Sequence, residues 1–121
     1  MTLQLNDASL LKYQAYIDGH WVSADNGETL TVTNPVDDSP LAEVASCGTG
    51  ETRRMIEAAN RAQPGWAAAT AKQRATLLRD WYNLIIEHQE DLARILTAEQ
   101  GKPLSEARGE ILYGASYLEW F

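Results

Sequence analysis

The chain has 121 residues, 45% of them hydrophobic, and its 10 basic and 17 acidic side chains give a formal net charge of −7. This length and composition suit one modest globular domain and argue against a disordered chain. The negative charge disfavours nucleic acid and anionic membranes as partners, because a phosphate backbone is bound by basic patches.

A single cysteine, Cys47, can form neither an internal disulfide nor a cysteine metal cluster. Residues 1–14 lack a basic start followed by an apolar run, so we expect no signal peptide. The most apolar stretch, residues 111–121, is too short to span a bilayer. These features predict a protein of the reducing cytoplasm.

The first part of the chain carries strand and turn signals. Residues 16–22 read Tyr-Ile-Asp-Gly-His-Trp-Val, which predicts a hairpin turning at Asp18-Gly19, because both positions tolerate a positive φ. Alternation of Thr with apolar residues over 29–33 predicts a half-buried strand, stopped by Asn34-Pro35. A further short strand is expected over 41–46.

Helical periodicity follows. A first helix is predicted to begin at Thr49 or Gly50 and to end at Pro64-Gly65. A second helix is predicted to begin near Ala71. Its apolar side chains recur at helical spacing, at Leu77, Leu78, Trp81, Leu84 and Ile85.

The helical pattern breaks near 88–91 and then continues to Gly101, a residue that suits the position after a helix end. Pro103 suits the first turn of a last helix, which is apolar on almost every side. One stripe holds Leu104, Ala107, Ile111, Ala115 and Leu118, and another holds Tyr113, Tyr117 and Trp120. Such a helix must be covered on several sides. We therefore expect the chain to be cut from a larger fold, and a dimer that buries this helix is the alternative.

Few residues suggest chemistry on their own. His20 and His88 are isolated from any metal-binding spacing, so we expect no divalent metal site. Cys47 has no histidine near it in sequence that would favour a thiolate, so we interpret it as a small strand-end residue. Gly48 and Gly50 precede a helix, a pattern that fits either an anion-binding helix start or a capping turn.

The carboxylates of the helical part form no clear acid–base pair. Glu106 and Glu110 share one helix face, which is usually a solvated arrangement. Glu99 precedes Gly101-Lys102-Pro103 and either ligates a cation or caps a helix. From the residues alone, the chain is an α/β domain without a complete active site.

Residues 99–107, Glu-Gln-Gly-Lys-Pro-Leu-Ser-Glu-Ala, resemble the E-x-GKP-xxEA segment of the aldehyde dehydrogenase superfamily. Further segments resemble the family in the same order: 16–21, 33–35, 58–62 with Trp66, 74–81 and 92–94. The final segment, from Gly109 to Phe121, is most similar to the succinate-semialdehyde and glutarate-semialdehyde branch. The resemblance covers nearly the whole chain.

The resemblance implies an α/β fold, namely the N-terminal portion of the aldehyde dehydrogenase cofactor-binding domain, with short strands and a hairpin followed by three to four helices. We divide the chain into an N-terminal arm (1–14), a hairpin and strand segment (15–47) and a helical segment (48–121), all within one incomplete domain. The family's catalytic cysteine, general-base glutamate, oxyanion-hole asparagine and nucleotide-binding units would lie beyond Phe121. We therefore assign no catalytic or cofactor-binding residue to this chain.

Two peripheral sites are implied by the resemblance. A monovalent cation is held in the family by backbone carbonyls and one acid, and the matching positions are Val32, Thr33 and Glu99. Oxygen ligands suit such a hard cation. The alternative is that Glu99 caps the turn at Lys102-Pro103.

Gly109, Glu110 and Tyr113 resemble helix positions that line the mouth of the family's substrate tunnel. The Tyr113 ring is expected to pack against an aliphatic semialdehyde chain, and simple core packing is the alternative.

The family mechanism is attack of a thiolate on the aldehyde, hydride transfer to NAD(P)+ and hydrolysis of the thioester. The resemblance thus implies part of an enzyme that oxidises succinate semialdehyde, or a similar aliphatic semialdehyde, to the acid with NAD or NADP. The partners would be the remainder of the dehydrogenase and a small aldehyde, and the complete enzyme would be a homo-oligomer. This chain alone is predicted to be inactive and to bind no cofactor. The alternative function is a stand-alone interaction module that dimerises, or binds an intact dehydrogenase, through its last helix.

Overall fold

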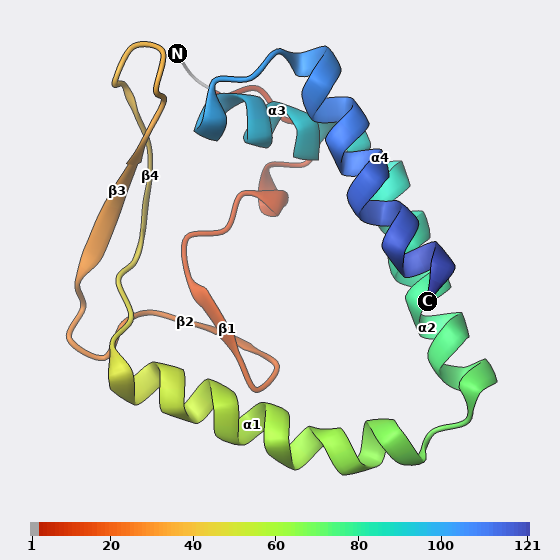
Figure 1. Cartoon of the computed structure of the whole chain (residues 1–121). Coiled ribbons are helices and arrows are strands. Elements are labelled where there is room, and N and C mark those ends of the chain that lie inside the picture. Colours follow the sequence, from red (N-terminus) through yellow and green to blue (C-terminus); the bar gives the residue numbers. More distant parts are fainter. Residues whose placement is uncertain (1–2) are drawn as a thin grey trace. The chain divides into compact units, whose positions relative to one another are not determined.

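A computed structural model describes residues 3–121, and Figure 1 shows its elements in chain order. A short 3-10 helix η1 (Ala8–Leu10) precedes strands β1 (Ala15–Ile17), β2 (His20–Val22), β3 (Thr29–Thr33) and β4 (Pro40–Ala45). Helices α1 (Thr49–Ala68), α2 (Ala71–Glu87), α3 (Gln89–Gln100) and α4 (Leu104–Trp120) follow. The predicted order of short strands and then helices is confirmed. Residues 1 and 2 of the predicted N-terminal arm lie outside the described residues.

Contacts divide the chain into two compact units, each built from separate stretches of sequence. The first unit contains residues 3–11, 33–41 and 70–121, and therefore helices α2, α3 and α4. The second unit contains residues 12–32 and 42–69, and therefore the β1–β2 hairpin and α1. No helix within residues 3–121 is long and apolar enough to cross a membrane.

The predicted hairpin is confirmed. Strands β1 and β2 pair antiparallel, with Ala15 opposite Val22 and Ile17 opposite His20. Asp18 and Gly19 form the turn with φ values of 50° and 81°, the positive pair that matches the twist of two tightly joined strands. Ile17 is buried in the second unit, where β1 lies against α1.

Strands β3 and β4 form a separate two-stranded sheet. The predicted bounds of β3 are confirmed, and β4 begins one residue earlier than expected, at Pro40. The prediction of a half-buried β3 holds for Val32 but is wrong for Leu30, whose exposed fraction is 62%. A sheet of two strands has little surface to cover such a side chain.

Helix α1 begins after Gly48, and the buried carboxylate of Glu51 accepts hydrogen bonds from the backbone N–H groups of Gly48 (3.1 Å) and Asp25 (2.6 Å). The predicted stop at Pro64-Gly65 is wrong, because the helix continues to Ala68. Proline removes a single N–H donor, whose helical acceptor would be the carbonyl of Asn60. Both residues are exposed, so water can satisfy that carbonyl.

Local capping chemistry sets the next boundaries. Thr70 and Gln73 form a reciprocal capping box at the start of α2, close to the predicted position. His88 separates α2 from α3, which confirms the predicted break. Helix α3 ends at Gly101, whose left-handed φ of 73° lets its N–H donate to the carbonyl of Thr97 at 2.8 Å.

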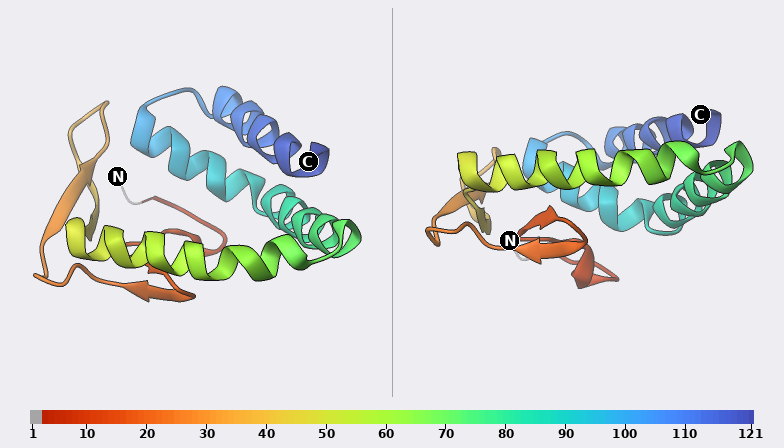
Figure 2. Two further views of the ribbon diagram at one scale, coloured as in Figure 1. Left: turned by 60° about the horizontal axis from the view of Figure 1, so that its bottom comes forward. Right: turned by 90° about the horizontal axis from the view of Figure 1, so that it is seen from below.

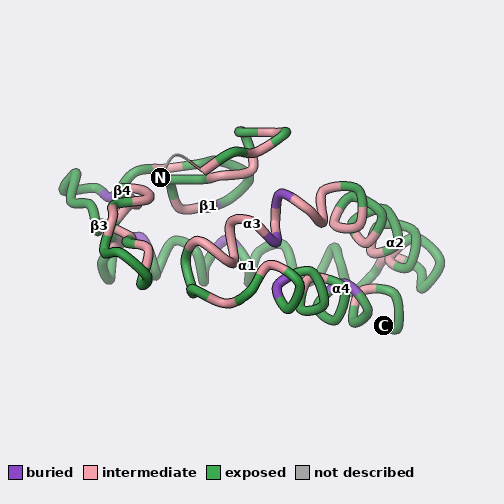
Figure 3. Tube along the Cα trace, turned by 90° about the horizontal axis from the view of Figure 1, so that it is seen from above, coloured by how far each residue is buried: buried purple, intermediate pink, exposed green. Residues whose placement is uncertain are grey.

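Helix α4 packs against α3 and α2 within the first unit (Figure 2). Small residues allow this approach: Ala93 on α3 and Ala107 on α4 are fully buried, and Ala115 is 1% exposed. The purple segments of α3 and α4 in Figure 3 mark such buried positions. The stripe predicted along α4 is confirmed, since all of its members are buried or half-buried: Leu104, Ala107, Ile111, Ala115 and Leu118.

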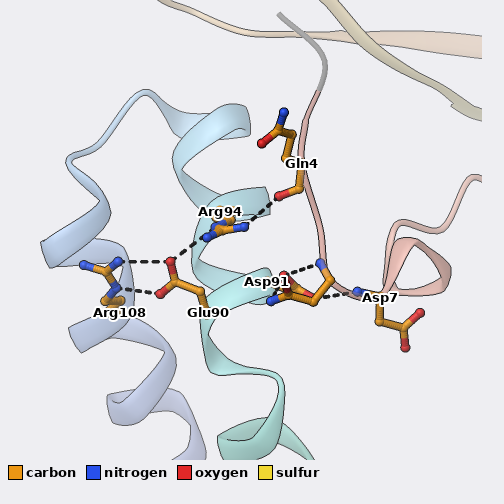
Figure 4. A network of polar contacts seen from close by, with 7 residues as sticks. Gln4, Asp7, Glu90, Asp91, Arg94 and Arg108 are labelled. Atoms are coloured by element: carbon orange, nitrogen blue, oxygen red, sulfur yellow. Dashed lines mark hydrogen bonds and ion pairs between the residues drawn. The ribbon is translucent and has the colours of Figure 1, made fainter.

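A buried carboxylate ties the start of the chain to α3 (Figure 4). Asp91 is 2% exposed and accepts hydrogen bonds from the backbone N–H groups of Asn6 (2.9 Å) and Asp7 (2.8 Å), and from the Asn6 side chain (3.2 Å). Next to it, Arg94 donates to Glu90 (3.2 Å) and to the backbone carbonyl of Gln4 (3.0 Å). Charge-assisted hydrogen bonds therefore help to hold the arm on α3.

This anchor predicts an acid-sensitive contribution to stability. The backbone N–H groups of Asn6 and Asp7 hold the pKa of Asp91 below its usual value, although burial opposes them. The contribution is therefore complete above the unfolded-state pKa of about 3.9 and is lost as pH falls through the lower folded-state value. We expect Asp91→Asn to lower Tm at neutral pH by about 5 °C. It should also flatten the acid side of the Tm–pH curve, measured by circular dichroism.

Asp80→Asn supplies the matched control, because Asp80 lies exposed on α2. An equal fall of Tm in both variants, or an unchanged acid limb in Asp91→Asn, would contradict the anchoring role of Asp91.

Candidate functional site

Four residues form a line along the outer surface of α4: Gly109, Glu110, Tyr113 and Tyr117, named here the α4 strip. Their spacings of three, four, seven and eight positions put them on one side of a helix. All four are exposed in this chain. The opposite side of α4 carries the buried alanines, so the strip faces away from α2 and α3.

Two tyrosines form the centre of the strip. The hydroxyl oxygens of Tyr113 and Tyr117 lie 2.6 Å apart, and the ring centroids lie 5.2 Å apart in an edge-to-face arrangement at 86°. The hydrogen bond with Tyr113 raises the pKa of Tyr117. Tyr113 is 64% exposed and so is not part of this chain's own core. The paired rings and hydroxyl groups give the strip an amphipathic surface.

The negative charge that Glu110 brings to the strip is neutralised by a lysine. The Lys102 ammonium lies in the turn between α3 and α4 and forms an ion pair with the carboxylate of Glu110. The Lys102 side chain is only 25% exposed, against 48% for Glu110. Gly109, one position earlier, leaves a notch, because a Cβ there would meet no atom within 4 Å.

Sequence reasoning missed Lys102 and Tyr117 as members of this site. The signal for Tyr117 was present, since Tyr113 and Tyr117 stand four apart on a predicted helix. Lys102 had no comparable signal, because it pairs across a turn whose path depends on Gly101.

The proposed cation ligands Thr33 and Glu99 belong to stretches that lie together in the first unit. A Cβ built on Gly101 would stand 3.0 Å from Cγ of Pro35, so the end of α3 lies directly against the residues after β3. Thr33 and Glu99 are both exposed, and Val32 is half-buried. Residues 3–121 hold no cluster of three or more His, Cys, Asp or Glu side chains suited to a metal. A cation site at these positions stays a prediction.

The start of α1 at Gly48 and Gly50 already binds a carboxylate of the chain itself. The carboxylate of Glu51 accepts the N–H of Gly48, and the N–H of Asp25 holds the pKa of Glu51 below its usual value. A carboxylate of the chain itself thus lies where an anion would bind, which favours the capping interpretation.

A hollow in the second unit, between the hairpin turn and α1, carries arginines that are already paired. Arg54 forms two hydrogen bonds of 2.8 Å with Asp25, and Arg61 binds Asp18 at 3.1 Å. His20 lines the same hollow. The paired guanidinium groups leave no uncompensated basic patch there.

Comparison with known proteins decides the family. Residues 21–121 match the profile of the aldehyde dehydrogenase family. The chain belongs to the aldehyde dehydrogenase family. The predicted resemblance is therefore confirmed, and so is the predicted fold, the N-terminal part of the aldehyde dehydrogenase fold.

Individual dehydrogenases match nearly the whole chain. The NADP+ succinate-semialdehyde dehydrogenase GabD of Escherichia coli (strain K12) is 57% identical over 119 residues, which cover 98% of this chain. The glutarate-semialdehyde dehydrogenase of Pseudomonas putida (strain KT2440) is also 57% identical over 98% of this chain. The crystal structure of an E. coli NADP-dependent enzyme has a TM-score of 0.95, with 57% identity over 97% of this chain.

The chain spans about a quarter of the length of these relatives: 25% of each of the two sequences and 24% of the solved chain.

Proposed function

We propose that this chain forms the N-terminal part of an aldehyde dehydrogenase that oxidises succinate semialdehyde, or a similar aliphatic semialdehyde, to the acid with NAD(P)+. The observation that carries the proposal is 57% identity with the E. coli succinate-semialdehyde enzyme across 98% of this chain. The chain would open the cofactor-binding domain, with an arm (1–14), a strand segment (15–47) and a helical segment (48–121). The complete protein would be a cytoplasmic homo-oligomer that holds NAD or NADP.

Within this enzyme the α4 strip would contribute to the mouth of the substrate tunnel. Its surface supports the proposal, because Gly109 leaves room and Tyr113 offers an exposed aromatic face beside it. An aliphatic chain can pack on such a face.

A monovalent cation would be held near the end of β3 by Val32 and Thr33, with Glu99 as the acidic ligand. The contact between Gly101 and Pro35 supports this part of the proposal, because it brings the stretches of Thr33 and Glu99 together.

The chain by itself is proposed to be inactive and to bind no dinucleotide. Its only cysteine, Cys47, is half-buried and follows β4 with no histidine beside it in sequence. An acyl-transfer nucleophile needs a thiolate and a partner that activates it. Both would be supplied by the remainder of the dehydrogenase.

A chimera tests this function. The 119 matching residues of the E. coli enzyme are replaced by those of this chain, and NADPH formation from succinate semialdehyde is followed by absorbance. We expect a kcat/KM within about ten-fold of the E. coli enzyme, because a correctly packed N-terminal part leaves the reacting groups in place. The purified 121-residue chain should show no turnover.

Two results would count against the proposal. One is a folded, soluble chimera without semialdehyde oxidation. The other is NAD(P)-dependent aldehyde oxidation by the 121-residue chain alone. A chimera in which the same residues come from a second succinate-semialdehyde dehydrogenase serves as the control for the junction.

One observation favours a second function, a stand-alone module that dimerises or binds an intact dehydrogenase. Trp120 is 83% exposed, and the aromatic stripe of α4 lies open along with it. Large open apolar patches mark interaction surfaces. Light scattering separates the two functions: a folded, monodisperse dimer of the isolated chain favours the module, and an aggregating chain favours the dehydrogenase part.

A further inference from the structure

The α4 strip and the proposed substrate both carry a carboxylate. A semialdehyde of succinate or glutarate carries a carboxylate at the end opposite the aldehyde, and Glu110 presents a second carboxylate on the strip. Two like charges that pass within several ångströms repel each other, and the repulsion grows as water is excluded. An unpaired Glu110 would therefore weaken binding of an anionic aldehyde while leaving a neutral aldehyde unaffected.

Lys102 stands where it can remove this repulsion. The left-handed Gly101 and the extended Pro103 (φ −57°, ψ 140°) direct the turn so that the Lys102 ammonium contacts the Glu110 carboxylate. Because its side chain is three-quarters covered, the ion pair is partly shielded from solvent. Partly shielded pairs are screened by salt less than fully exposed ones.

No other described cation pairs with Glu110. Arg108 stands two positions earlier, but it is engaged by Glu90 through hydrogen bonds of 2.7 and 3.0 Å. Glu106, one turn before Glu110, adds a further negative charge to the start of α4. The positive charge that reaches the strip thus comes from Lys102.

We infer that Lys102 favours the binding of anionic semialdehydes by neutralising Glu110 at the α4 strip. The inference rests on the proposed function, since it assumes that substrate passes the strip. Lys102 acts through Glu110 and is not assigned contact with the reacting atoms.

The test uses the active chimera described above, with succinate semialdehyde as the anionic aldehyde and butanal as the neutral one. Lys102→Met keeps the aliphatic stem and removes the charge. It is expected to raise KM for succinate semialdehyde about five-fold, with a smaller change in kcat and no matching rise for butanal. Raising the salt concentration to about 0.5 M should shrink the difference between the two substrates.

A second substitution separates charge from structure. Lys102→Met combined with Glu110→Gln removes both charges, so the double variant should return KM for succinate semialdehyde to within about two-fold of the unsubstituted chimera. Arg79→Met is the matched control, because it breaks the ion pair of 2.8 Å between Arg79 on α2 and Glu119 on α4. That control should change neither KM.

Distinct outcomes overturn the two proposals. An equal rise of KM for both aldehydes, or no recovery in the double variant, overturns the role of Lys102 while the chimera's activity still supports the dehydrogenase function. A folded chimera that oxidises neither aldehyde overturns the proposed function, and the inference about Lys102 falls with it.

Discussion

Filling the notch at Gly109 should lower kcat/KM of the chimera for succinate semialdehyde by about ten-fold or more, because a benzyl group there would narrow the proposed tunnel mouth beside Tyr113. The substitution Gly109→Phe suits the test, since a Cβ at Gly109 meets no atom of this chain within 4 Å. Local folding should therefore tolerate the new side chain. The measurement is steady-state kinetics on the purified chimera.

Gly114→Phe is the matched control on the same helix. A Cβ at Gly114 also meets nothing within 4 Å, and its position is about 140° round the helix from Gly109. Phenylalanine is a better helix former than glycine, so neither substitution should lower Tm through α4 itself. If both variants lose activity equally, or neither does, the α4 strip is not the surface that substrate passes.

Local signals in the sequence were sufficient for most of the elements. The Asp18-Gly19 turn, the strand over 29–33 and the break at His88 were all predicted correctly. Each depends on neighbours within four residues, through positive φ, side-chain alternation or capping. Gly101 belongs to the same class, because the helix end requires its left-handed backbone.

Two local predictions were wrong because the outcome depended on exposure to solvent and on the number of neighbouring strands. Pro64 normally ends a helix, yet α1 continues past it, since the freed carbonyl is exposed to water. Leu30 has the alternation of a buried strand residue but remains open on a two-stranded sheet. A sequence pattern predicts which side of a strand or helix is apolar. It does not predict which other element covers that side.

The contacts that anchor the N-terminal arm on α3 could not be predicted because they are long-range. Asp91 binds residues 84 and 85 positions earlier in the chain, and no spacing rule links such distant groups. The pair of Lys102 and Glu110 crosses a helix boundary. The resemblance to the family supplied Glu110 and Tyr113, whereas the neutralising lysine and the second tyrosine came from the structure.

Gly101 offers the largest expected effect on stability. Its φ of 73° is strained for any residue with a Cβ, and that Cβ would lie 3.0 Å from Cγ of Pro35. We expect Gly101→Ala to lower the free energy of unfolding by about 2–3 kcal/mol, of which about 1 kcal/mol is backbone strain and the rest steric overlap. Urea unfolding of the chimera, followed by circular dichroism, measures the loss.

Gly27 separates backbone strain from steric overlap. It has the same φ of 73°, but a Cβ added there would meet nothing within 4 Å. Gly27→Ala should therefore cost only the backbone strain, about 1 kcal/mol. Equal losses in the two variants would mean that the contact with Pro35 adds nothing. A larger loss at Gly101 would show that the end of α3 is fixed against the Asn34-Pro35 turn. That fixed turn is the support on which the proposed cation site at Thr33 and Glu99 depends.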